Sequence, residues 1–86
     1  MTLQFDYEIE NEQFDIKKFF DEEGHLPFNP NSKIQMKVMM EEVCDKLTIT
    51  DEYLVKKLEV VLKYDLPFFA TTRNLARNWV VENFIF

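Results

Sequence analysis

The chain has 86 residues, of which 47% are hydrophobic and 30% charged, and its formal net charge at pH 7 is −6. This length allows one small domain, and no apolar run approaches the roughly 18 residues that a membrane-spanning helix needs, so we expect no membrane segment. The single cysteine excludes an intramolecular disulfide, and the chain opens without a signal peptide, so we expect a cytoplasmic protein.

The negative charge is concentrated near the N-terminus. Residues 1–23 contain eight acidic residues and two lysines, which gives −6, whereas residues 24–86 contain eight acidic and eight basic residues. Contact with nucleic-acid phosphates requires a basic face, so this distribution argues against direct binding to nucleic acid.

An alternating pattern predicts an acidic extended arm or strand over residues 1–12. Its apolar residues are Leu3, Phe5, Tyr7 and Ile9, and its polar residues are Gln4, Asp6, Glu8 and Glu10. A lone strand needs a neighbour, which could be residues 80–86, another copy of the chain or a sheet edge on a partner. A disordered acidic arm is the alternative.

The spacing of apolar residues over 13–86 predicts a helical domain with an apolar C-terminal tail. A first short helix is expected over residues 14–23, with Ile16, Phe19 and Phe20 on one face and Gly24 at its end. After a loop with two prolines, Asn31 or Ser32 can cap a longer helix. Its apolar stripe, which we interpret as core, consists of Met36, Met39, Met40, Val43 and Leu47.

Two further helices complete the prediction. Thr50 or Asp51 can cap the first of them. Its apolar face consists of Leu54, Leu58, Val61 and Leu62, and its solvent-exposed face consists of Lys56, Lys57, Glu59 and Lys63. Glu59 and Lys63 are spaced as a surface ion pair. This helix should end before Pro67. Thr71 or Thr72 can cap the last helix, in which Leu75, Ala76, Trp79 and Val80 align.

The expected fold is therefore mainly α, a small domain of three or four helices with a short N-terminal extended or β segment. We expect its core to contain Met36, Met40, Val43, Leu54, Leu58, Leu62, Leu75 and Trp79.

No arrangement of residues indicates an enzyme. His25 is the only histidine, and Cys44 lies in a helix beside the apolar stripe, where an inert thiol is expected. Two such residues do not make a zinc site, and no glycine-rich phosphate loop is present. We expect no cofactor and no metal.

Two groups of residues are candidates for contact with a protein partner: Asp6, Glu8 and Glu10 in the leader, and Trp79, Phe84, Ile85 and Phe86 at the C-terminal end. Aromatic anchors of this kind dominate many interfaces. The tail residues could equally complete the core. Two other functions remain open. The leader could imitate nucleic acid in a basic groove, and the last two helices could form a helix-turn-helix that presents Arg73, Asn74, Arg77 and Asn78.

The helical part, residues 34–86, resembles the late-transcription coactivators of T4-type phages. The similarity lies in three features and in the final residues: a helix with Met39-Met40-Glu41-Glu42, a helix opened by Glu52-Tyr53-Leu54, a Leu66-Pro67 break, and Asn83-Phe84-Ile85-Phe86. Members of that family are small acidic adaptors that bind the flap of host RNA polymerase and reach the phage sliding clamp through an apolar C-terminal peptide. The resemblance implies the same two partners here.

The function we expect is that of a non-enzymatic protein-binding adaptor or inhibitor, a phage transcription regulator that acts on host RNA polymerase in the host cytosol. Self-association into a homo-oligomer is left open.

Overall fold

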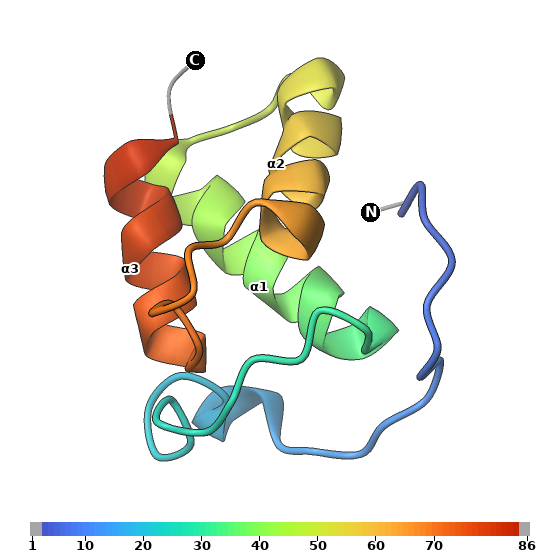
Figure 1. Ribbon diagram of the computed structural model, residues 1–86, viewed down its shortest axis with the longest axis vertical. Coiled ribbons are helices and arrows are strands. Elements are labelled where there is room, and N and C mark those ends of the chain that lie inside the picture. Colours follow the sequence, from blue (N-terminus) through green and yellow to red (C-terminus); the bar gives the residue numbers. More distant parts are fainter. Residues whose placement is uncertain (1–2, 85–86) are drawn as a thin grey trace.

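Three α-helices carry the fold, and the computed structural model describes residues 3–84. The helices are α1 (Lys33–Leu47), α2 (Glu52–Tyr64) and α3 (Arg73–Asn83), and a 3₁₀ turn, η1 (Ile16–Lys18), precedes them. Figure 1 shows α2 and α3 packed on α1, with the N-terminal arm along the side of the bundle away from α3. The predicted mainly α domain with an extended N-terminal segment is confirmed.

Each helix begins at a side-chain cap. Ser32, Asp51 and Thr72 each accept a hydrogen bond from a backbone N–H two or three residues later, and each was one of the two caps predicted for its helix. A cap of this kind stabilises a helix by about 1 kcal/mol. The sequence thus locates all three starts.

α1 ends in an unusual turn at Thr48. This residue has φ 55° and ψ 48°, in the left-handed region, and its backbone N–H donates to the carbonyl oxygen of Cys44. The turn directs Ile49 back into the core, where its side chain is 7% exposed. Left-handed backbone costs an L-residue roughly 1–2 kcal/mol, so Thr48 is a strained position.

α1 supplies the largest share of the core, and its methionine stripe was predicted to be core. The helix supplies the fully buried side chains Met36, Met39, Met40 and Val43, and α2 supplies Leu58 and Leu62. Leu54 is partly buried at the edge of this cluster. The methionine stripe is therefore core and not a binding surface.

The N-terminal arm is extended but forms no strand. Leu3, Phe5 and Tyr7 turn toward the helices, as the alternation predicts, yet Ile9 is 38% exposed. The arm packs on helices, and within residues 3–84 its one β-bridge is the parallel bridge between Ile9 and Ser32. The expected partner segment, residues 80–86, is helical up to Asn83.

The helix expected over residues 14–23 is wrong. Only η1 forms there, and Ile16 is 64% exposed although it was expected on the same face as Phe19, which is fully buried. Phe19 is fully buried, and its ring contacts those of Phe14 and Phe20 at centroid distances of 5.1 and 4.9 Å. A longer helix could not gather these three rings on one side, so packing overrides the local pattern.

The buried face of α3 also differs from the prediction. Leu75 is 48% exposed and Trp79 is only partly buried, whereas Ala76 and Val80 are fully buried and Arg73 is 6% exposed. Ala76 belongs to the core cluster, and α3 packs against α1. Leu75 therefore does not belong to the core.

Candidate protein-docking surface

The connection between α2 and α3 exposes two phenylalanines. Pro67 is the first residue of a tight turn in which the backbone N–H of Ala70 donates to its carbonyl oxygen at 3.0 Å. Ala70 points inward and is 5% exposed, so the intervening Phe68 and Phe69 occupy the outer corner at 92% and 55% exposure. Their rings meet edge to face at 5.7 Å. The tight turn therefore places both rings in solvent.

Tyr64 extends this exposed group, and the partly buried Phe5 lies beside it. Tyr64, the last residue of α2, is 64% exposed, and the ring of Phe5 from the arm packs against it edge to face at 5.5 Å. We call Phe5, Tyr64, Phe68 and Phe69 the aromatic surface. Soluble monomers seldom expose several adjacent large rings unless a partner covers them.

A cavity of about 460 Å³ opens between Tyr64 and Phe68. Its wall is held by the pairing of two loops: the backbone N–H of Phe28 donates to Thr71 at 2.9 Å, and the N–H of Arg73 donates to Leu26 at 3.0 Å. The lining is mainly apolar and includes three prolines, Pro27, Pro30 and Pro67, with Phe28, Leu62 and Leu66. Its size and lining suit a large apolar side chain.

A buried carboxyl group fixes the arm beside this surface. Glu59 is 1% exposed and accepts two hydrogen bonds from the arm, one from the Tyr7 hydroxyl and one from the backbone N–H of Gln4 at 3.0 Å. The Nζ atom of Lys63 lies 4.2 Å from the Tyr7 ring centroid. Burial, followed by the hydrogen bond and the charge of Glu59, raises the pKa of Tyr7 well above its usual range.

The expected surface pair of Glu59 with Lys63 is therefore wrong. Glu59 faces the arm instead, and Lys63 lies over the Tyr7 ring. A signal was present in the sequence, because Val55, Leu58, Glu59 and Leu62 follow i, i+3, i+4, i+7 spacing, which places Glu59 on the apolar stripe.

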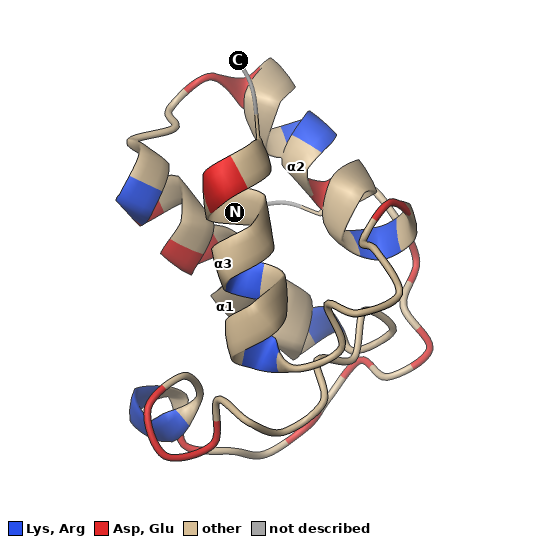
Figure 2. Cartoon of the chain, turned by 60° about the vertical axis from the view of Figure 1, so that its left-hand side comes forward, with Lys and Arg blue, Asp and Glu red and all other residues tan. Residues whose placement is uncertain are grey.

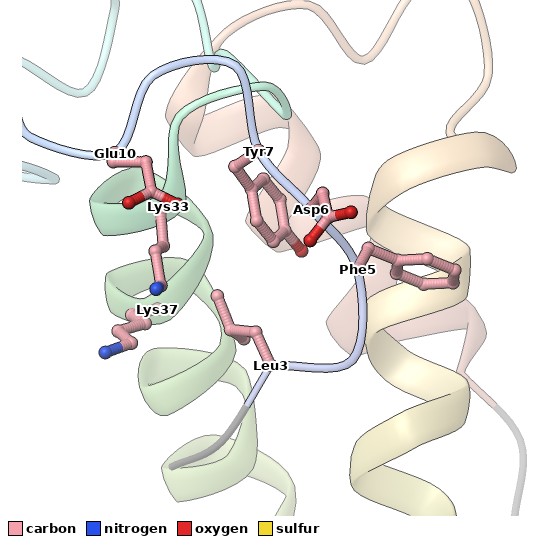
Figure 3. Close-up of a pocket in the computed structure, with 7 residues that line it drawn as sticks. All are labelled: Leu3, Phe5, Asp6, Tyr7, Glu10, Lys33 and Lys37. Atoms are coloured by element: carbon pink, nitrogen blue, oxygen red, sulfur yellow. The ribbon is translucent and has the colours of Figure 1, made fainter.

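The three predicted acidic residues of the arm, Asp6, Glu8 and Glu10, are all exposed. Figure 2 shows acidic residues along the arm and on the loop after η1. Figure 3 shows Glu10 beside Lys33 and Asp6 beside Tyr7, around a second cavity of about 320 Å³. Glu12, by contrast, accepts hydrogen bonds from Ser32 and Gln35 and holds the base of the arm.

The predicted C-terminal contact residues do not form one group. Phe84 is 9% exposed and belongs to the core. For this residue, the structure agrees with the alternative in which the tail completes the core. Trp79 lines a cavity of about 280 Å³ next to Phe84. Ile85 and Phe86 lie outside the described residues.

Both arginines of the helix-turn-helix alternative are engaged by other parts of the chain. The guanidinium of Arg73 lies 4.0 Å from the Phe19 ring centroid. Arg77 pairs with Glu42 at 3.2 Å and lies 4.8 Å from the Phe20 ring centroid. Neither arrangement presents a guanidinium to a DNA groove.

The described residues hold no candidate metal site, and their one cysteine is a free thiol. Among residues 3–84, no three His, Cys, Asp or Glu side chains are placed to hold a metal ion. Cys44 is a free thiol whose pKa is raised by burial and then by the charges of Asp45 and Glu41. Within the same residues, no helix is long and apolar enough to cross a membrane.

Comparison with known proteins adds no relative: no family model, curated protein or solved structure matches the chain.

Proposed function

We propose that this chain is a non-enzymatic adaptor that binds another protein through its aromatic surface. The observation that carries the proposal is Phe68, which is 92% exposed at the mouth of an apolar cavity of about 460 Å³. Burying one phenylalanine side chain contributes about 1.5–3 kcal/mol, and this gain is available only on contact with a partner.

The shape of the surface supports this function. A projecting ring beside a preformed cavity resembles the anchor-and-pocket pairs that dominate protein interfaces. The turn at Pro67 and the paired loops behind it hold both features in place, so little ordering is needed on binding.

The finer proposal is that the partner is bacterial RNA polymerase and that the chain regulates transcription of a phage. It rests on the resemblance of residues 34–86 to the T4-type coactivators. The same resemblance suggests a sliding clamp as a second partner, and Ile85 and Phe86 are then the residues to test, because Phe84 lies in the core.

A binding assay with purified bacterial RNA polymerase core enzyme tests the proposal. Removing an interface anchor costs 2 kcal/mol or more, so Phe68→Ala should weaken binding by about 30-fold or more. Tyr53→Ala is the matched control, since Tyr53 is 73% exposed at the opposite end of α2. Equal affinities for the wild type and Phe68→Ala would refute the docking role of this surface in polymerase binding.

A nucleic-acid mimic is the second candidate, and the exposure of Asp6, Glu8 and Glu10 favours it. The two functions predict opposite mutational results. For a mimic, Asp6→Asn combined with Glu8→Gln and Glu10→Gln abolishes binding to a basic groove, whereas Phe68→Ala leaves it intact.

A further inference from the structure

The aromatic surface carries a projecting ring pair and a cavity side by side. Phe68 and Phe69 project from the turn that begins at Pro67, and their rings meet edge to face at 5.7 Å. Phe68 also lines the cavity of about 460 Å³, together with Tyr64. One face of the molecule therefore holds both halves of an anchor-and-pocket contact.

The cavity has room for such a ring pair. A benzene-sized ring needs a cavity of about 150 Å³, so two rings need roughly 300 Å³. The cavity offers about 460 Å³, and its apolar wall includes Pro27, Phe28, Pro30, Leu62 and Leu66. The ring pair of one copy of the chain thus matches the cavity of another copy in size and in polarity.

A second copy supplies both halves of the contact at once. In a two-fold symmetric dimer the same patch meets itself, so every contact is made twice. Phe68 of one copy can enter the cavity of its partner while the partner's Phe68 enters the first cavity. An unrelated protein would need an anchor and a pocket of its own to cover the same face.

The exposed area is that of a weak, reversible dimer. Tyr64, Phe68 and Phe69 are 64%, 92% and 55% exposed. At about 200 Å² for a whole aromatic side chain, the three expose roughly 400 Å² per copy, or roughly 800 Å² in two copies. Exposed residues of the cavity wall, Pro27 and Thr71, add to this. The total comes close to the roughly 1,000 Å² that a specific interface needs.

Little charge lies at the contact. Among the described residues that line the cavity, the one charged side chain is Lys63, whose Nζ atom lies 4.2 Å from the Tyr7 ring centroid. The net charge of −6 on each copy repels the other copy. That repulsion is screened beyond about 8 Å at physiological ionic strength, so the dimer should tighten as salt is added.

We propose that the chain forms a two-fold symmetric dimer in which Phe68 and Phe69 of each copy fill the cavity of the other. This inference goes beyond the proposed adaptor function, because it concerns the chain alone. If both hold, the second copy and the protein partner compete for the aromatic surface, so the chain docks on its partner as a monomer.

Sedimentation velocity of the full chain, from micromolar to millimolar concentration, tests the inference. The average mass should rise from that of one chain toward that of two. Phe68→Ala should raise the dimer dissociation constant by at least about 30-fold, because it removes the anchor from both halves of the contact. Tyr53→Ala is the control and should change it by no more than about twofold, since Tyr53 is 73% exposed at the opposite end of α2.

A complementary variant makes the test specific for reciprocal insertion. Thr71 is exposed and lines the cavity, so Thr71→Trp blocks the cavity and keeps the projecting rings. Phe68→Ala does the opposite. A mixture of the two variants restores one of the two contacts, so the mixed dimer should form at least about tenfold more tightly than either variant pairs with itself.

A chain that stays monomeric at millimolar concentration would overturn the inference and leave the adaptor function untouched. Equal effects of Phe68→Ala and Tyr53→Ala would also overturn it, because self-association would then use another surface. A mixture that pairs no more tightly than its components would refute reciprocal insertion. Failure of the adaptor function is seen separately, as polymerase binding that is indifferent to Phe68→Ala.

Discussion

Replacing Tyr7 by phenylalanine should destabilise the chain by about 2–3 kcal/mol. The Tyr7 hydroxyl is one of two donors to the Glu59 carboxyl group, which is 1% exposed, so water cannot readily replace the lost donor. A hydrogen bond to a charged group contributes about 1.5–3 kcal/mol, and the oxygen left without a partner remains buried. The expected loss is large, because a chain of this size has a total stability of about 4–13 kcal/mol.

Urea unfolding followed by far-UV circular dichroism measures the effect. Tyr53→Phe is the control, and it should change stability by less than about 0.5 kcal/mol because Tyr53 is 73% exposed. The double variant Tyr7→Phe with Glu59→Leu should cost less than the sum of the two single changes, since it removes donor and acceptor together. A cost below about 0.5 kcal/mol for Tyr7→Phe, or strict additivity, would refute this account of the arm.

The same bond predicts a dependence on pH. Burial and Glu59 raise the pKa of Tyr7 in the folded state, so folding favours the protonated phenol. The stabilisation is therefore complete below the unfolded-state pKa of about 10 and falls above it, by up to about 1.4 kcal/mol per pH unit. Unfolding curves on both sides of that pH should show a steeper loss for the wild type than for Tyr7→Phe. Identical slopes would contradict the assignment.

Three further changes are predicted for unfolding free energies measured in the same way. Phe84→Ala should lower the free energy of unfolding by about 3 kcal/mol because Phe84 is a core residue. A loss below about 1 kcal/mol would show that its side chain is not packed in the core. Leu75→Ala should lower the free energy of unfolding by less than about 1 kcal/mol, since Leu75 is 48% exposed. A larger loss would show that Leu75 is part of the core. Thr48→Gly should stabilise the chain by about 0.5–1 kcal/mol by relieving the left-handed strain, and destabilisation would show that the strain is absent.

The local features of the fold could be predicted because they depend on neighbours in sequence. The caps Ser32, Asp51 and Thr72 need only a side-chain oxygen and the next turn of backbone. The methionine stripe of α1 follows from helical periodicity. Both predictions agree with the structure.

Features set by contacts between distant residues could not be predicted in the same way. Glu59 is buried because the arm brings Tyr7 to it from 52 residues away, and no local rule supplies that donor. Arg73 was one of the polar residues that the helix-turn-helix alternative presents at the surface, yet it lies against Phe19. In both cases a polar group is buried because another segment supplies its partner.

The candidate surface was missed for a related reason. The apolar run at Phe68 and Phe69 reads as a piece of core or a helical turn, because hydropathy does not show on which side of a tight turn a side chain lies. The turn from Pro67 to Ala70 decides this and turns Ala70 inward. The acidic arm residues, in contrast, were correctly expected to be exposed from their alternation.

The most direct test of the central claim is photo-crosslinking from the aromatic surface. A benzophenone side chain is placed at position 68 in one variant and at position 53 in another, and each is irradiated with RNA polymerase core enzyme. The account predicts a cross-link to a polymerase subunit from position 68 and little or none from position 53. A cross-link from position 53 alone would show that the chain binds through a different surface.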